Sequence, residues 1–171
     1  MTRTATIAIL AAALAVSACA KKAPKELPVG PQGSVTTDDG TGGTSAGAIV
    51  PGTQADFVQQ MMGQDTIYFD TDRFNIDSAD QQALAVQASW LQRYPAKRIT
   101  IEGHCDERGT REYNLALGER RANAAKNQLV SLGVDPMRIT TVSYGKERPV
   151  AVGSDEESWA KNRRSVTVTV D

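Results

Sequence analysis

The sequence contains few of the residues on which metal, cofactor and disulfide chemistry usually depends. Its 171 residues include two cysteines and one histidine, His104, and aromatic residues make up 5% of the chain. Zinc sites are built mainly from several histidines and cysteines. The formal net charge of −1 and the lack of a long basic run argue against a nucleic-acid-binding protein. We therefore expect no cofactor, no metal centre and no nucleic-acid partner.

One apolar run stands out, at the N-terminus. Residues 1–20 read MTRTATIAILAAALAVSACA, in which Arg3 precedes an apolar stretch too short to span a membrane comfortably as a permanent helix. This layout predicts a signal peptide over residues 1–18. The run Val16–Cys19 resembles the bacterial lipobox, which implies cleavage before Cys19 and lipidation of its sulfur. The alternative is a plain secretory signal with an incidental cysteine.

If Cys19 is lipidated, the residue after it indicates the membrane and the remaining cysteine limits disulfide formation. The next residue is Ala20, and not the aspartate that is linked to inner-membrane retention in lipoprotein families. The resemblance therefore implies an outer-membrane lipoprotein that faces the periplasm. Cys105 would be the remaining thiol, so no intramolecular disulfide could form despite an oxidising compartment.

The segment that follows has the composition of a tether. From Lys21 to about Gln54 the chain is rich in Gly, Thr, Pro and Ser and has no apolar periodicity. Such a segment buries too little surface to offset its conformational entropy. We expect a flexible tether over residues 19–55, with a mean span of about 30 Å, and one compact domain over residues 56–171.

The predicted domain alternates strands and helices. Asp77 and Ser78 are candidate caps of the first main helix, with a capping box from Ser78 to Gln81. The order β-α-β-α-β-α-β predicts an α+β fold, an α/β sandwich in which two main helices cover one face of a mixed sheet. Strands are expected at 66–70, 97–103, 138–144 and 165–170, main helices from 78 to Pro95 and from Thr110 to Leu132, a short helix near 155–161, and a lone turn or helix at 56–62.

Two adjacent arginines in the second main helix are predicted to face different ways. On a helical wheel, Arg120 lies about 170° from the centre of the apolar stripe and therefore faces water. Arg121 lies about 70° from that centre, at the border between core and solvent, and Asn114 lies on the same border. The apolar stripe consists of Leu115, Gly118, Ala122, Ala125, Leu129 and Leu132.

Asp106 follows the second strand, directly before this helix. Ligands of open α/β sheets bind at the carboxyl ends of strands. A pocket between Asp106 and Arg121 would suit a zwitterion, because the carboxylate can bind an ammonium group and the guanidinium a carboxylate. The alternative is that these two side chains pair with each other or with Glu107 and Arg108.

Four motifs carry a family resemblance: IYFDTDRFNID at 67–77, EGHCDERGTREYNLALGERRANA at 102–124, SYGKERP at 143–149 and KNRRSV at 161–166. Together they resemble the OmpA-like peptidoglycan-binding domain, most closely in its Pal-type lipoproteins. The resemblance implies non-covalent binding of peptidoglycan, without cleavage, through meso-diaminopimelate in the stem peptide.

The resemblance also assigns residues and partners. It implies that Asp106 and Arg121 hold the charged D-centre of diaminopimelate, that Asn114 belongs to the motif, and that Phe69 and Asp70 form another pocket wall. It further implies docking onto TolB, and through the Tol system a role in envelope integrity and cell division. Two more residues, Arg163 and Arg164, are interpreted as a structural clamp near the last strand.

Three other functions are open at this stage. An enzyme would use His104 as a general base with Ser143 or Cys105 as the nucleophile, but adjacent side chains on an extended strand diverge. A metal site at residues 104–107 would need four consecutive donors to close a tetrahedron. A wall-anchoring lipoprotein without a Tol partner is the third. We expect a binding protein rather than an enzyme, in which Cys105 makes the site sensitive to oxidation.

Overall fold

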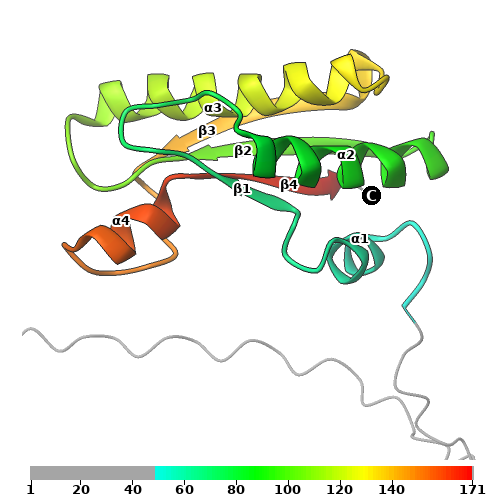
Figure 1. Ribbon diagram of the computed structural model, residues 1–171, viewed down its shortest axis with the longest axis horizontal. Coiled ribbons are helices and arrows are strands. Elements are labelled where there is room, and N and C mark those ends of the chain that lie inside the picture. Colours follow the sequence, from blue (N-terminus) through cyan, green and yellow to red (C-terminus); the bar gives the residue numbers. More distant parts are fainter. Residues whose placement is uncertain (1–48, 171) are drawn as a thin grey trace, which may run out of the picture. The chain divides into compact units, whose positions relative to one another are not determined.

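The computed structural model describes residues 49–170 as a four-stranded mixed sheet with helices packed against it. The predicted signal peptide, Cys19 and most of the predicted tether lie outside these residues. In the sheet, whose order is β1-β4-β2-β3, β2 and β3 run parallel and the other pairs antiparallel (Figure 1). The predicted α+β fold is confirmed. The strands are β1 (Thr66–Tyr68), β2 (Arg98–His104), β3 (Ile139–Gly145) and β4 (Arg164–Val170).

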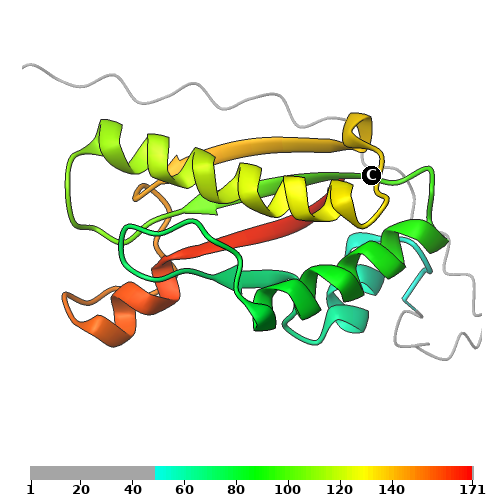
Figure 2. The same ribbon diagram turned by 45° about the horizontal axis from the view of Figure 1, so that its top comes forward.

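Two long helices, α2 (Ser78–Arg93) and α3 (Arg111–Ser131), cover one face of the sheet, as Figures 1 and 2 show. Within the described residues no helix is both long and apolar enough to cross a membrane. The shorter helices are α1 (Gln54–Met61), the 3₁₀ turn η1 (Pro136–Arg138), which the sequence pattern did not predict, and α4 (Glu156–Asn162).

Local hydrogen bonds explain where the long helices begin. Asp77 caps α2 in a capping box with Asp80, so the box begins one residue earlier than the predicted Ser78–Gln81 pair. Thr110 caps α3, as predicted, by accepting a hydrogen bond from the backbone N–H of Tyr113.

The core lies between the sheet and the helices and continues under α1. The Trp90 ring, fully buried, packs edge-on against Phe57 with 4.9 Å between ring centroids. Its Nε1–H donates to Asp56, which also accepts from the backbone N–H of Gly52. The packed part of the chain therefore begins before Asp56. Other core residues include Met61, Ile67, Leu84, Leu91, Ile99, Ile101, Ala122 and Leu129.

Two glycines set the distance between α3 and the central strand. A Cβ atom at Gly103 in β2 would overlap the carbonyl oxygen of Gly118 in α3, and a Cβ at Gly118 would overlap the hydroxyl of Ser143. The Ser143 hydroxyl donates to Leu115 O at 2.7 Å, which fixes β3 to the same helix. Strand and helix backbones therefore approach so closely that only a hydrogen atom fits between them at these positions.

We predict that Gly103→Ala lowers the free energy of unfolding by about 3 kcal/mol or more, because the new methyl group meets backbone that cannot rotate away. Urea denaturation would measure this loss. Gly63→Asn is the control, since nothing lies within 4 Å of a Cβ at Gly63 and Asn tolerates its left-handed backbone. Equal losses for the two variants would contradict the close packing of α3 on β2.

Candidate functional site

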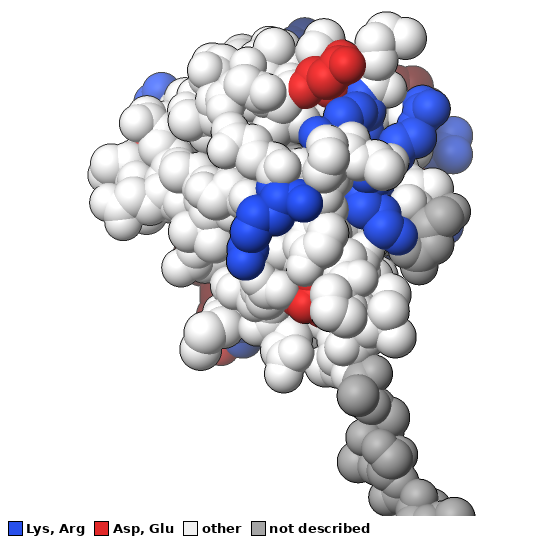
Figure 3. All heavy atoms as spheres, turned by 90° about the vertical axis from the view of Figure 1, so that its right-hand side faces the viewer, with Lys and Arg blue, Asp and Glu red and all other residues white. Residues whose placement is uncertain are grey.

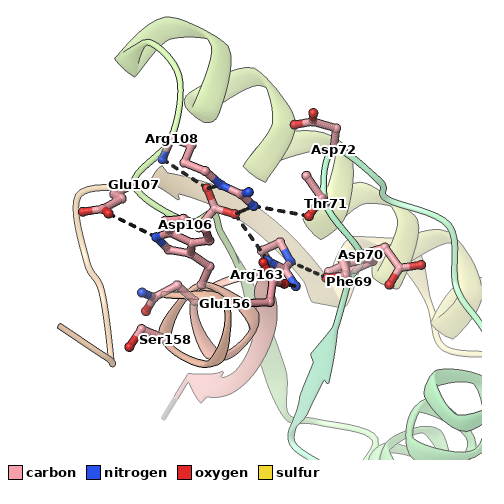
Figure 4. A network of polar contacts seen from close by, with 12 residues as sticks. Phe69, Asp70, Thr71, Asp72, Asp106, Glu107, Arg108, Glu156, Ser158 and Arg163 are labelled. Atoms are coloured by element: carbon pink, nitrogen blue, oxygen red, sulfur yellow. Dashed lines mark hydrogen bonds and ion pairs between the residues drawn. The ribbon is translucent and has the colours of Figure 1, made fainter. Parts of the chain in front are cut away.

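A cluster of charged side chains lies at the carboxyl end of β2 (Figure 4). It is formed by the loop that joins β2 to α3, by the segment after β1, and by the junction of α4 with β4. The residues come from distant parts of the sequence, and Arg108 and Arg163 both reach Asp106. The cluster therefore depends on the tertiary fold rather than on one motif.

Asp106 is the acidic centre of the cluster, and its side chain is 9% exposed. Arg108 donates to it from Nη2 at 2.6 Å, from Nε at 3.2 Å and from the backbone N–H at 3.1 Å. Burial alone would raise the pKa of Asp106, but the hydrogen bonds and charge of Arg108, with Arg163 behind them, hold that pKa below its ordinary value. Asp106 is therefore an anion at neutral pH.

Arg163 supplies the second positive charge. Its side chain is 8% exposed, and its Nη1 lies 3.5 Å from Asp106 Oδ2. Nε donates to the carbonyl of Phe69 at 2.9 Å, and Nη2 to Glu156 at 2.7 Å. Among the described residues Nη1 has no hydrogen-bond acceptor. The cluster thus holds a buried donor that a ligand oxygen would satisfy.

Arg121 lies deeper than the helical wheel predicts: it is 0% exposed rather than at the border with solvent. The segment after β1 crosses over α3, and the carbonyls of Asp70 and Arg73 accept hydrogen bonds from its Nη2 and Nε at 3.0 and 2.9 Å. Nη1 donates to the carbonyl of His104 at 2.9 Å. Burial lowers the pKa of Arg121, although a guanidinium group stays charged.

The wheel separates the two arginines correctly but misjudges the rotation of the helix about its own axis. Arg120 is exposed, as predicted, whereas Asn114 is buried rather than at the border. The Asn114 amide donates to the carbonyls of Arg108 and Thr110 at 2.7 and 3.0 Å, which holds the loop before α3. The buried face of α3 is centred on Leu117, Gly118, Arg121, Ala122, Ala125 and Leu129, and Leu115 and Leu132 are half-buried.

The predicted second wall, Phe69 and Asp70, lies beside this cluster. The Phe69 ring is buried, with the guanidinium carbon of Arg121 5.1 Å from its centroid. The Asp70 side chain is exposed. Both residues line a pocket of about 360 Å³ together with Tyr68, Asn75, Asp77, Asp80, Ala160, Lys161 and Arg163.

Arg108 and the start of α4 were not predicted as site residues. The Arg108 guanidinium lies 4.2 Å from the ring centroid of Trp159 and donates to Thr71, so it covers Asp106 from the solvent side. Trp159 Nε1–H in turn donates to Glu107. The sequence gives little indication of the contact between Arg108 and Trp159, because Trp159 lies far along the chain from the loop that carries Arg108. In the structure Asp106 therefore pairs with a charged side chain of its own loop. The alternative interpretation of the sequence predicted this pairing with Arg108.

Arg163 and Arg164 have different roles. Arg163 contacts Asp106 and belongs to the cluster. Arg164 donates to the carbonyls of Asn162 and Arg148, which ties the start of β4 to the loop before α4. The predicted structural clamp describes the contacts of Arg164 well.

The groups considered for catalysis do not face one another. His104 Nε2 lies 3.3 Å from Glu102, the Cys105 thiol donates to Asn114 O, and the Ser143 hydroxyl donates to Leu115 O. Burial raises the pKa of Cys105 to about 11 and, with Arg164 and Arg148, lowers that of His104 to about 4. The described residues contain no group of three acidic, histidine or cysteine side chains placed to hold a metal ion.

The fold and this cluster define a class of protein. The OmpA family model matches residues 68–163. The C-terminal domain of Helicobacter pylori MotB superimposes with a TM-score of 0.58 at 22% identity, over 62% of this chain and 84% of that domain, which shows the shared fold.

Relatives at higher identity give the particular group. A peptidoglycan-associated lipoprotein of Agrobacterium fabrum is 48% identical over 98% of this chain and 89% of its own length, and one of Brucella melitensis is 52% identical over 91% and 85%. The crystal structure of the peptidoglycan-associated lipoprotein from Burkholderia pseudomallei has a TM-score of 0.60 at 47% identity, over 61% of this chain and 89% of that one. The chain therefore belongs to the OmpA family, among the peptidoglycan-associated lipoproteins.

We predict that His104 makes the domain less stable in mild acid. Its folded pKa of about 4 lies below its ordinary value of 6.5. Between these values the unfolded chain binds a proton that the folded chain does not. The contribution of His104 to the free energy of unfolding should be constant above pH 6.5 and fall by up to about 3 kcal/mol toward pH 4.

Urea denaturation between about pH 7 and pH 4 would test this for the wild type and His104→Gln. The variant should lose most of the pH dependence, whatever its absolute stability. Asp106 does not affect this comparison. Because its folded pKa is below the ordinary value of 3.8, its contribution to the free energy of unfolding is lost only below about that pH. An unchanged slope in His104→Gln would show that another group is responsible.

Proposed function

We propose that this protein is a non-catalytic anchor that binds the peptide stem of peptidoglycan through meso-diaminopimelate. The observation that carries the proposal is the cluster at the carboxyl end of β2, in which the Asp106 carboxylate pairs with the guanidinium groups of Arg108 and Arg163. Membership among the peptidoglycan-associated lipoproteins supports the choice of ligand. The ligand suits the site because its D-centre carries an ammonium and a carboxylate on one carbon atom.

In the proposed complex the ligand ammonium binds Asp106 and takes the place of the Arg108 guanidinium. Arg108 is the exchangeable partner, since its side chain is 39% exposed whereas that of Arg163 is 8% exposed. Replacing one cation by another keeps the buried carboxylate neutralised, which avoids the cost of an unpaired buried charge.

The ligand carboxylate would bind on the guanidinium side of the cluster. Arg121 carries the charge and holds the loop carbonyls, and Arg163 offers a buried N–H without an acceptor. Phe69 and Asp70 line the adjoining pocket, which reaches the cluster at Arg163. Asn114 acts indirectly, because its amide fixes the loop that carries Asp106.

The proposed lipid anchor and tether rest on the sequence. Residues 1–18 would be the signal peptide, Cys19 the lipidated residue and residues 19–55 the tether that connects the outer membrane to the wall-binding domain. Several acyl chains anchor firmly, since each buried methylene contributes about 0.8 kcal/mol. The protein would then face the periplasm from the outer membrane.

A role in the Tol–Pal system, with TolB as the partner, completes the proposal. It rests on the resemblance of the four sequence motifs to Pal-type lipoproteins, and it is consistent with relatives that are named peptidoglycan-associated lipoproteins. Such a complex would let the outer membrane follow the cell wall at division. A wall anchor without a Tol partner is the alternative.

The first test is cosedimentation of the full-length protein with purified sacculi. Asp106→Asn preserves the shape of the side chain and removes its charge, so we expect binding at least tenfold weaker, about 1.4 kcal/mol or more. Arg121→Lys should also weaken binding, since lysine lacks the planar fork. Arg120→Ala should bind like the wild type, because Arg120 is exposed.

Two controls make the sacculus experiment decisive. Free meso-diaminopimelate should compete, whereas L-lysine, which lacks the D-centre carboxylate, should not. Thermal denaturation must show that each variant is folded at the assay temperature, because breaking a buried ion pair costs about 3–5 kcal/mol. Equal losses for folded Arg120 and Arg121 variants, or equal competition by both amino acids, would exclude the proposed site.

The Tol assignment makes a separate prediction. TolB should be captured with the protein after cross-linking in intact envelopes, and the yield should persist when the predicted lipid anchor is removed by Cys19→Ala in a secreted form. Failure of TolB capture, together with normal binding to sacculi, would favour the generic wall anchor.

A further inference from the structure

The adjoining pocket is larger than the D-centre of diaminopimelate requires. Its volume is about 360 Å³, which is within the range of sites that hold a whole small ligand. Phe69 and Asp70 line it from the segment after β1, and Lys161 lines it from α4. The pocket therefore has room for a further residue of the peptide stem.

Arg163 connects the adjoining pocket to the cluster. It lines the pocket, and its Nη1 lies 3.5 Å from Asp106 Oδ2. Figure 4 shows the Arg163 guanidinium group between Asp106 and Phe69. A ligand whose ammonium group is held by Asp106 can therefore extend past Arg163 into the pocket.

Two of the carboxylates that line the pocket serve the start of α2. Asp77 Oδ1 accepts from the backbone N–H of Asp80 at 2.8 Å, and Asp80 Oδ1 accepts from the backbone N–H of Tyr68 at 3.3 Å. The partial positive charge of a helix N-terminus offsets negative charges in this position. Asp70 is exposed, and its carboxylate can accept an N–H group of a ligand.

Lys161 is the exposed cation of the pocket. Its ammonium group lies 2.6 Å from Glu157, one turn earlier in α4, and the two side chains are 56% and 80% exposed. An exposed pair of this kind adds little stability, so a ligand carboxylate can replace Glu157 at small cost. Arg163 stays in place, because it donates to the carbonyl of Phe69 and to Glu156.

Positive charge alone does not identify a carboxylate site. Figure 3 shows Lys and Arg side chains gathered on another face of the domain, at the right-hand side of Figure 1, whereas α4 lies at the left. Lys161 differs from a cation on an open surface because it shares a pocket with the buried Arg163 and with Asp70.

We propose that the adjoining pocket is a second subsite, in which Lys161 binds a carboxylate of the stem residue next to diaminopimelate and Asp70 accepts an N–H of the amide between them. The inference rests on the proposed function, because diaminopimelate in the cluster fixes where the next residue lies. Two residues carry such a carboxylate: the γ-linked D-glutamate before diaminopimelate and a terminal D-alanine after it. The subsite makes the protein bind stem peptides more tightly than free diaminopimelate.

Isothermal titration calorimetry with three soluble ligands tests the subsite. The protein is the mature chain, residues 19–171 with Cys19→Ala, and the ligands are diaminopimelate, L-alanyl-γ-D-glutamyl-diaminopimelate and diaminopimelyl-D-alanine. One of the two peptides should bind about fivefold tighter than diaminopimelate, and that peptide identifies the source of the carboxylate. Lys161→Gln should remove this gain and leave the affinity for diaminopimelate within about twofold of the parent.

Two further variants separate the subsite from a general effect of charge. Arg111→Gln removes the same charge from another exposed ion pair, the one with Glu147, and should keep the gain. Glu157→Gln removes the side chain that competes for Lys161. It should therefore bind the favoured peptide about twofold tighter than the parent, with no change for diaminopimelate.

Equal affinities of the parent chain for all three ligands would overturn the subsite, and so would equal losses in Lys161→Gln and Arg111→Gln. If diaminopimelate itself does not bind, the proposed function fails and the subsite fails with it. Binding of diaminopimelate without a gain from either peptide rejects the subsite alone, so the two failures are distinguishable.

Discussion

A fully buried guanidinium group must have its N–H donors satisfied, and Arg121 meets this requirement with carbonyl groups from two separate segments. Asp70 and Arg73 belong to the loop after β1, and His104 ends β2. Each unmet donor would cost roughly 1–3 kcal/mol or more, so the loop cannot leave α3 without a large loss. The close approach of α3 to β2 at Gly103 and Gly118 brings the arginine near the end of β2, where it reaches the His104 carbonyl. The shape of the candidate site therefore depends on this one side chain.

The same burial explains why the cluster is suited to a charged ligand. Arg121 and Arg163 are two buried cations, and Asp106 is the buried anion between elements that are otherwise far apart in sequence. Arg108 supplies further charge from the solvent side, and it is the more exposed of the two partners of Asp106. In the proposed complex an ammonium replaces Arg108 and a carboxylate approaches the buried guanidinium groups. The site then gains an acceptor for Arg163 Nη1, and the ligand centre itself brings no net charge because it is a zwitterion.

Sequence patterns predicted the elements well because each has a local cause. Thr110 begins α3 and Asp77 begins α2 through hydrogen bonds to residues three positions away, and such signals are visible in the sequence. The direction of Arg120 relative to Arg121 follows from helix geometry alone. The depth of Arg121 does not, since it depends on a loop some 48 positions earlier in the chain. The pairing of Asp106 with Arg163 is equally non-local, because β4 brings Arg163 to the end of β2. A single sequence contains no signal for either contact.

The entry of the chain near Gly52 and the loop with Asp106 also determine how a pulling force would pass through the domain. The chain enters at Gly52, whose N–H is bonded to Asp56, and Gln54 accepts hydrogen bonds from the backbone and side chain of Thr169 in β4. β4 is antiparallel to β2, and β2 carries the loop with Asp106 at its far end. A force between the tether and a wall-bound ligand would therefore run along the strands and load the β2–β4 hydrogen bonds together, in shear, rather than one after another. Because opening such a ladder requires many bonds to break at once, the sheet resists this direction of pulling better than a direction across it. In the proposed function that direction is the one between the outer membrane and the wall.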